Sequence, residues 1–150
     1  MPNSPAWDIA TKIMEAGIAS TDPSSNLPLI RVGFEPDVNE KTLLTIYDTG
    51  GQPSNPAYQR DYPRIQVRTK SPNEMGYNQA FKAQQDVKDL ILGMDRFTVT
   101  NDDLSETLYV GIWMQVDISP LAPDQNKRPV LISSYRIVRE YTSANRRPIV

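Results

Sequence analysis

The most restrictive feature of the sequence is the alternation of apolar and polar residues between Pro63 and Lys70. Successive side chains of a β-strand point to opposite faces, so Ile65 and Val67 share one face of this segment. The opposite face carries the polar residues Arg64, Gln66 and Arg68. A strand of this kind belongs in a sheet that is buried on one face and solvent-exposed or cationic on the other.

Helical and strand patterns follow one another in the order α-β-β-β-α-β-β-β. The predicted helices are residues 5–16 and 72–92, and the predicted strands are 29–34, 42–47, 63–70, 97–100, 107–118 and 130–139. The last two strands should form an antiparallel hairpin across a loop of about ten residues. The predicted fold class is α+β, with a mostly antiparallel sheet and two helices packed on one face. We expect one domain over residues 1–140 and a C-terminal tail over 141–150.

Local signals predict the ends of both helices. Ser4 is the expected N-cap of the first helix, and Gly17 can adopt the left-handed conformation that ends it. Ser71-Pro72-Asn73-Glu74 matches a capping box, in which Ser71 caps the second helix and Glu74 reaches back to the cap. Gly93 is the expected end of that helix.

Three further patterns predict which side chains are buried and where one strand ends. The second helix should bury one stripe, interrupted by Gln84, that comprises Tyr77, Ala80, Phe81, Val87, Leu90, Ile91 and Met94. The strand at 107–118 should turn one apolar face inward, made of Leu108, Val110, Ile112, Met114, Val116 and Ile118. The turn Asp48-Thr49-Gly50-Gly51 should end the strand before it.

Composition removes most catalytic chemistry from consideration. The chain has neither cysteine nor histidine, so it lacks a thiolate nucleophile, a Cys-type zinc site and the commonest general base. A net charge of −2 is unlike that of a general nucleic-acid binder. The remaining acid–base or metal candidates are Asp95, Asp102, Asp103 and Glu106, which a polar turn explains better than a metal loop does. We expect no catalytic, cofactor-binding or metal-binding residues and no enzyme activity.

The sequence shows no pattern typical of export or of a membrane span. Residues 1–10 lack a basic n-region followed by an apolar h-region. No apolar run approaches the roughly 20 residues needed to cross a bilayer. We expect a soluble protein made in the cytoplasm.

Two loops and one strand carry residue types that protein interfaces favour, because Tyr and Arg combine an apolar body with a directed polar end. The predicted interface residues are Tyr58, Arg60, Tyr62, Arg64, Arg68, Asp124, Asn126, Lys127 and Arg128. Two simpler interpretations stay open: the tyrosines hold their loop to the sheet, and residues 124–128 are a solvated hairpin tip. The Arg146-Arg147 pair in the tail could bind nucleic acid, an acidic protein or nothing.

The order of these segments resembles the tail terminator proteins of long-tailed bacteriophages, also called minor capsid proteins. The resemblance covers about residues 5–140. Its most telling pieces are Pro63–Arg68 before the helix, and Pro120-Leu121 followed by Asp124, Asn126 and Arg128. Ala122-Pro123 stands where the family usually has Gly-Arg, which stiffens the hairpin tip.

The resemblance implies a structural virion protein at the tail–neck junction, made in the host bacterial cytoplasm. Such proteins form a ring, typically a homohexamer, on the head-proximal end of the tail tube. The ring ends tube polymerisation and joins tail to head, and the genome passes through its lumen without specific binding. The expected partners are other copies of the chain, the tail tube protein and a head-completion or stopper protein.

Arg64 and Arg68 project from the same face, and we expect them to pair with acidic groups of a neighbouring subunit rather than with DNA. A strongly cationic lumen would hold the passing genome through its phosphates. Two other functions remain open. One is a different neck component, such as a head-completion or stopper protein. The other is a carboxylate-dependent metal hydrolase, which the missing metal-loop pattern disfavours.

Overall fold

A computed structural model describes residues 2–52 and 60–141 of the chain. Its elements are α1 (Pro5–Glu15), β1 (Leu29–Val32), β2 (Leu43–Gln52), β3 (Arg60–Lys70), α2 (Tyr77–Gly93), β4 (Phe97–Thr100), β5 (Glu106–Leu121) and β6 (Val130–Tyr141). The predicted element order is confirmed. The predicted interface residue Tyr58, the Arg146-Arg147 pair and most of the predicted tail lie outside the described residues.

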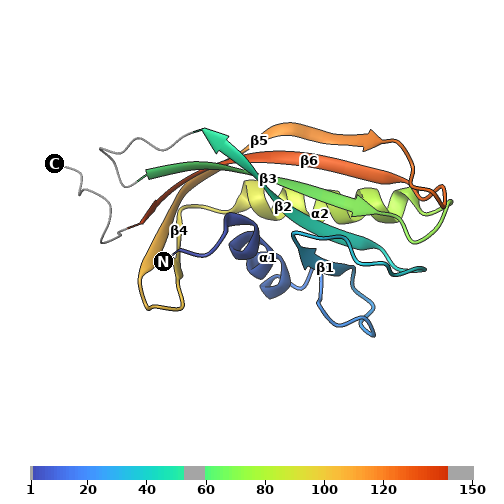
Figure 1. Cartoon of the computed structure of the whole chain (residues 1–150), viewed down its shortest axis with the longest axis horizontal. Coiled ribbons are helices and arrows are strands. Elements are labelled where there is room, and N and C mark those ends of the chain that lie inside the picture. Colours follow the sequence, from blue (N-terminus) through green and yellow to red (C-terminus); the bar gives the residue numbers. More distant parts are fainter. Residues whose placement is uncertain (1, 53–59, 142–150) are drawn as a thin grey trace.

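The six strands form one sheet in the order β1-β2-β3-β6-β5-β4 (Figure 1). Strand β1 runs parallel to β2, whereas the other four pairings are antiparallel. The sheet is therefore mixed, and its antiparallel part includes the predicted β5–β6 hairpin. The α+β class is confirmed.

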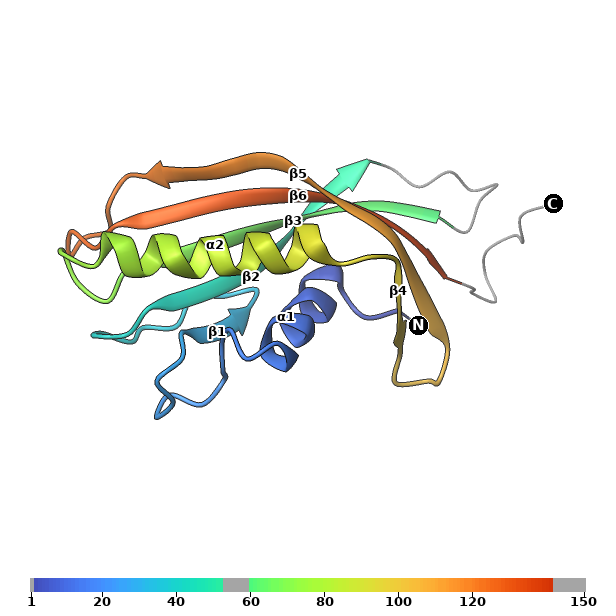
Figure 2. The ribbon, with the colours of Figure 1, turned by 180° about the vertical axis from the view of Figure 1, so that it is seen from behind.

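Both helices cover the same face of the sheet (Figure 2). Ile9 and Ile13 of α1 pack in one core with Val87 and Ile91 of α2. The sheet contributes core side chains from five of its strands, including Ile30, Leu44, Ile46, Ile65, Val67, Tyr109, Tyr135 and Ile137. Neither helix of the described residues covers the other face of the sheet, and we call that face the open face.

Helix α1 begins and ends at the predicted signals. The Ser4 hydroxyl accepts a hydrogen bond from the Trp7 amide at 3.1 Å, which satisfies one of the unpaired N–H groups of the first turn. Gly17 follows the helix with a φ of +75°, where a residue with a Cβ would be strained. The Ser4 hydrogen bond and the left-handed conformation of Gly17 set the two ends of the helix. Both depend on residues at or next to the helix itself.

The predicted capping box is wrong. Helix α2 starts at Tyr77, and its N-cap is Gly76. Ser71 is instead held at the end of β3, where its amide donates to the Pro129 carbonyl at 2.9 Å and its hydroxyl donates to the Asn73 carbonyl. The pairing of β3 with the chain before β6 therefore overrides the local capping pattern.

The buried stripe of α2 also differs from the prediction. Tyr77 and Phe81 are 43% and 40% exposed, whereas Gln84 is fully buried. The side chains that face the sheet are Ala80, Ala83, Gln84, Val87 and Ile91. The two alanines let the helix lie close to the strands, and the pair of aromatic rings stacks on the outside.

Gln84 links α2 to the two central strands. Its amide nitrogen donates to the carbonyls of Val67 on β3 and Leu131 on β6, at 2.9 and 3.1 Å. Its amide oxygen accepts from the Ser133 hydroxyl at 2.8 Å. Burying an amide is favourable only with such partners, so the residue that seemed to interrupt the stripe is the polar centre of the helix–sheet contact.

The predicted break at Asp48–Gly51 is a β-bulge inside a longer strand. The register between β2 and β3 shifts between Asp48 and Gly51, and β2 continues to Gln52. Gly50 has a φ of +79°, and a Cβ on Gly51 would lie 2.2 Å from the Tyr62 carbonyl oxygen. The glycines allow the two strands to stay paired through the bulge.

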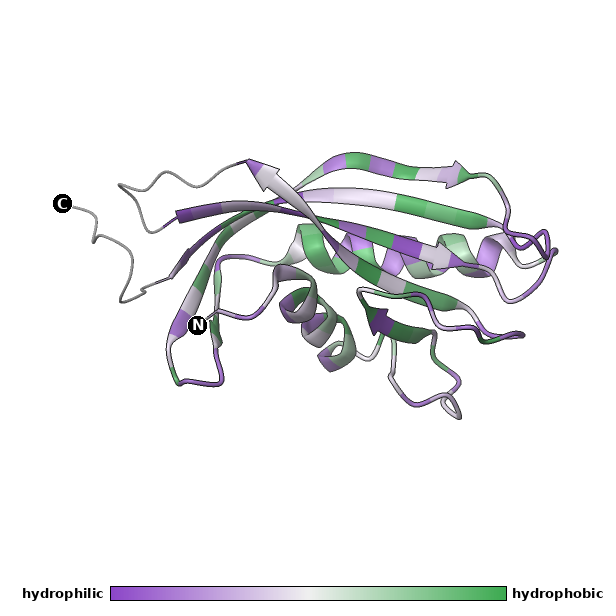
Figure 3. Ribbon diagram, in the orientation of Figure 1, coloured by the Kyte–Doolittle hydropathy of each residue, from purple (hydrophilic) through white to green (hydrophobic). Residues whose placement is uncertain are grey.

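The single apolar face predicted for residues 107–118 is also wrong. Figure 3 shows hydrophilic and hydrophobic residues following one another along β5. A register shift between Tyr109 and Gly111 inserts one extra residue, which moves the inward positions from odd to even numbers. Tyr109 is therefore buried against Phe97, with ring centroids 4.7 Å apart, while Ile112 and Met114 pack on the same core.

We expect the substitution Gln84→Ala to lower the free energy of unfolding by about 2–4 kcal/mol, because it leaves a cavity and an unpaired Ser133 contact. The control is Gln85→Ala, one residue further along α2, where the side chain donates to the exposed Asp89 at 2.9 Å. The free energy of unfolding of that variant should fall by less than about 0.5 kcal/mol. Urea denaturation followed by circular dichroism measures both, and equal losses would contradict the role assigned to Gln84.

Candidate functional site

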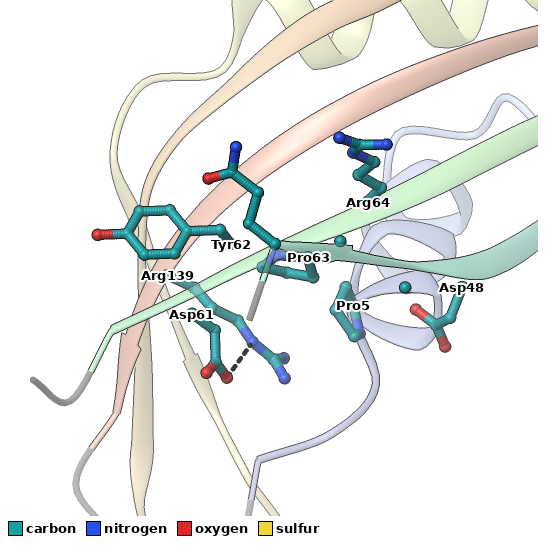
Figure 4. A pocket seen from close by; sticks show the side chains of 10 residues that line it. Pro5, Asp48, Asp61, Tyr62, Pro63, Arg64 and Arg139 are labelled. Carbon is teal, nitrogen blue, oxygen red and sulfur yellow. Dashed lines mark ion pairs between the residues drawn. The ribbon is translucent and has the colours of Figure 1, made fainter. Parts of the chain in front are cut away.

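The predicted interface residues of β3 share the open face. Arg60, Tyr62, Arg64 and Arg68 lie at even positions, opposite to the buried Ile65. Figure 4 shows Arg64 and Asp61 on opposite sides of the β3 ribbon. The structure thus brings these four predicted residues together along one strand.

One end of the open face is electrically neutralised within the chain. Lys70 forms ion pairs with Glu35 at 3.0 Å and with Asp124 at 3.1 Å. Arg68 lies 3.8 Å from the same Glu35, beyond hydrogen-bonding distance. Arg68 was predicted to meet an acid of a neighbouring subunit, and it has an acidic neighbour in its own chain.

The opposite end of β3 is neutralised in the same way. Arg60 stands across from Glu140 of β6, and its Nε donates to the carboxylate at 2.8 Å. Its terminal nitrogen contacts the same oxygen. Both ends of the strand therefore carry charges that are paired in the folded chain.

The middle of the open face has no such compensation. Arg64 is directly opposite Arg136 of β6, and Arg136 is directly opposite Trp113 of β5. Within residues 2–52 and 60–141, neither guanidinium forms a hydrogen bond or an ion pair. Like charges placed opposite one another on adjacent strands are destabilising, so this arrangement lowers the stability of the folded chain.

Trp113 completes this surface. It is 51% exposed, and its indole lies over Gly111, where an added Cβ would come within 2.9 Å of the ring. A side chain at position 111 would collide with this ring, so the glycine leaves room for Trp113, which is directly opposite Arg136 of β6. We call Arg64, Trp113 and Arg136 the open-face patch, and Trp and Arg are the residues most enriched in binding hot spots.

The second predicted group, residues 124–128, forms the turn between β5 and β6. The Asp124 carboxylate accepts hydrogen bonds from the amides of Asn126 and Arg128, at 2.9 and 2.8 Å. Lys127 has a φ of +59° and is exposed at the tip together with Asn126. The turn is therefore closed by its own aspartate.

Arg128 is used inside the chain. Only 5% of its surface is exposed, and its guanidinium donates to three backbone carbonyls: Ser71 at 2.7 Å, Val38 at 3.0 Å and Lys41 at 3.0 Å. These carbonyls belong to the loop before β2 and to the end of β3. Arg128 thereby ties that loop to the β5–β6 turn.

The contacts of Asp124 determine its acidity. Burial alone would raise its pKa, but the Arg128 amide and the Lys70 ammonium stabilise the charged form more strongly and hold the pKa of Asp124 below its usual value. The carboxylate is therefore ionised throughout the neutral range, and its contacts persist there.

A small hollow lies beside the β2 bulge, lined by Pro5, Asp48, Asp61 and Arg139 among others (Figure 4). Its acids have structural partners. Asp48 accepts from the Ala6 amide of α1 at 2.9 Å, and Asp61 lies 3.6 Å from Arg139. Asp48 thus attaches α1 to β2, and Asp61 lies against Arg139 of the neighbouring strand β6, so both carboxylates of the hollow have structural partners.

The acids near residue 100 form the predicted turn. The Leu104 amide donates to the Asn101 carbonyl at 2.9 Å, and Asp103 accepts from the Ser105 amide at 3.1 Å. Among the described residues, no three acidic side chains are grouped closely enough to hold a metal ion. In the same part of the chain, neither helix is long and apolar enough to cross a membrane.

Sequence reasoning missed Arg136 and Trp113 as members of the surface. Arg136 lies between the buried Tyr135 and Ile137, so the alternation along β6 could have revealed it. Strict alternation along residues 107–118 would put Trp113 on the same face as Tyr109, and the bulge between them separates the two. That bulge has no clear sequence signal except Gly111.

The fold and this surface define a small α+β protein with a basic and aromatic patch on the open face of its sheet. The chain belongs to the bacteriophage tail terminator protein family, whose sequence model matches residues 12–141. A search of curated proteins returned no match. The family gives the chain a structural role in a phage tail, as a component of the virion, and confirms the resemblance found in the sequence.

We expect Arg128→Lys to lower the free energy of unfolding by about 2–4 kcal/mol, because an ammonium group cannot reach the same three carbonyls with the guanidinium geometry. Lys127→Ala, at the exposed neighbouring position, is the matched control and should change stability by less than about 0.5 kcal/mol. Thermal and urea unfolding measure both variants. A stable Arg128→Lys protein would show that the loop is held by other contacts.

Asp124 should contribute to stability in a pH-dependent way. Because its pKa is lowered by folding, its contribution is present above the unfolded value of about 4 and is lost as the pH falls through the folded value. The Asp124→Asn variant should therefore be less stable than the wild type at pH 7, and the difference should shrink as the pH falls below about 4. Urea unfolding at a series of pH values measures this, with Asp37→Asn as an exposed control. A difference that does not change with pH would rule out this linkage.

Proposed function

We propose that this protein assembles as a ring on the head-proximal end of the phage tail tube, ends tube polymerisation and joins the tail to the head. Family membership supports the tail role. The observation that favours assembly with further subunits is the open-face patch, where Arg64 and Arg136 stand opposite each other without an acidic partner in the described chain. A subunit that keeps two like charges together gains stability when a partner supplies the opposite charge.

The charge of the patch favours a head-to-tail contact between subunits. In a two-fold symmetric contact, the patch of one copy would meet the same patch of its partner, and four guanidinium groups would be brought together. A contact between two different surfaces avoids this repulsion. Head-to-tail contacts close into rings when the rotation between subunits divides a full turn.

The charge of the whole chain fits a lumen that the genome passes through without being held. The formal net charge is −2, and most basic groups of the open face are paired with acids, such as Arg60 with Glu140 and Lys70 with Glu35. A protein that neutralises many phosphates would hold DNA tightly and slow its passage. The partners we propose are other copies of the chain, the tail tube protein on one side of the ring and a head-completion protein on the side toward the head.

The direct test is assembly with purified tail tubes. Mass photometry of the wild-type chain should show one closed oligomer, near six copies, and electron microscopy should show one cap on one end of each tube. Capped tubes should not lengthen when tube protein is added, because the cap covers the growing end. A chain that stays monomeric and neither caps nor binds tubes would overturn the proposal.

A binding experiment separates this function from that of a head-completion or stopper protein. Immobilised wild-type chain should retain tail tubes from a mixture of tubes and tail-free heads. Retention of heads alone would place the chain on the portal side and would contradict capping of the tube. Binding of heads only after tubes have been added would support a position between the two.

A further inference from the structure

Two exposed surfaces of this chain are complementary in charge. One is the open-face patch of Arg64, Trp113 and Arg136. The other is the β4–β5 hairpin tip, residues 101–106, whose charged residues are Asp102, Asp103 and Glu106. The tip also carries Leu104, which is 82% exposed. One surface is basic and aromatic, and the other is acidic and apolar.

The tip is presented on a well-defined turn. The Asn101 amide donates to the Ser105 carbonyl at 2.8 Å, and the buried Asn101 side chain donates to the Thr107 hydroxyl at 2.9 Å. Asp103 is used inside the turn, where it accepts from the Ser105 amide. The Asn101 side chain also accepts a hydrogen bond from the Asn3 amide at 3.2 Å, which ties the turn to the start of the chain. Asp102, Leu104 and Glu106 are exposed on this turn.

The tip cannot be expected to meet the patch of its own chain. Figures 1 and 2 both show the β4–β5 hairpin bending away from the central strands β3 and β6. The patch lies on β3, β6 and the middle of β5. A contact between the two surfaces therefore requires two copies of the chain.

We propose that the tip of the β4–β5 hairpin of one copy docks on the open-face patch of the next copy. This inference rests on the proposed ring and specifies its subunit contact. Asp102 and Glu106 supply carboxylates to the guanidinium groups of Arg64 and Arg136, which form strong charge-assisted hydrogen bonds. Leu104 packs on the exposed indole of Trp113, which removes apolar surface of both from water.

The β4–β5 hairpin tip of a neighbouring copy accounts for more residues of the open-face patch than DNA would. Phosphates would pair with the two arginines but would not account for the half-exposed Trp113 beside them or for Leu104. The contact also joins two different surfaces, which is what a ring requires. Each subunit offers one tip and one patch, so every patch in a closed ring is filled.

Charge exchange tests the contact. The patch variant carries Arg64→Glu with Arg136→Glu, and the tip variant carries Asp102→Arg with Glu106→Arg. Each variant alone sets like charges against each other. We expect the protein concentration at half assembly to rise by about tenfold or more in each case.

Mixing the two variants should restore assembly. The acidic tip of the patch variant faces the basic patch of the tip variant, and the basic tip faces the acidic patch. An equimolar mixture should therefore form rings of alternating subunits, as measured by mass photometry and by caps on tail tubes. The control variant carries Lys82→Glu with Arg96→Glu, exposed positions outside both surfaces, and should assemble like the wild type.

The outcomes separate this contact from the ring itself. If the wild type and the patch variant assemble equally well, the contact is wrong and the ring stands. If the equimolar mixture assembles as poorly as each variant alone, the two surfaces do not meet and the contact is also wrong.

If the wild type neither oligomerises nor caps tubes, the proposed function fails first. If the patch variant forms normal rings but loses DNA binding shown by the wild type, the patch faces nucleic acid and this inference is overturned. Circular dichroism of every variant confirms that it is folded.

Discussion

Strands β3 and β6 lie at the centre of the sheet, and their two-residue alternation decides which side chains are buried and which are left on the surface. Ile65 and Val67 of β3, with Tyr135 and Ile137 of β6, face the helices and join one core. Gln84 of α2 bonds to the carbonyls of Val67 and Leu131, so the helix is attached to both strands at once. Because side chains on these strands cannot change face without a shift in register, Arg64 and Arg136 are directed to the open face by the same pattern that builds the core.

The chain neutralises most of that open face. Glu35 and Asp124 meet Lys70 at one end, and Glu140 meets Arg60 at the other. The loop that carries Glu35 is attached to the β5–β6 turn through the three carbonyl bonds of Arg128. The centre, with Arg64, Arg136 and Trp113, is left basic and partly apolar within the described chain. Two arginines placed opposite each other cost the folded chain some stability, and a complementary partner in the proposed ring would offset that cost.

Sequence patterns predicted what depends on local contacts. The limits of α1 follow from Ser4 and Gly17, β4 was predicted at the residues where it occurs, and the polar face of β3 follows from its alternation. The errors arise where distant segments decide the outcome. Ser71 looked like a helix cap but is held by Pro129, Gln84 looked misplaced but bonds to two strands, and a bulge reversed the faces of β5. Arg128 was predicted as an interface residue from its place in a charged loop. Its three carbonyl partners come from residues 38, 41 and 71, which no local pattern could reveal.

The reactivity of Trp113 toward hydroxyl radicals, measured in the monomeric and the assembled protein, tests the central claim most directly. Trp113 and Trp7 are exposed to a similar extent, at 51% and 55%, so Trp7 calibrates the radical dose in the monomer. Assembly through the open face predicts that Trp113 loses most of its reactivity when rings form, and that the patch variant, when prevented from assembling, keeps it. Rings in which Trp113 reacts as fast as it does in the monomer would contradict assembly through this face.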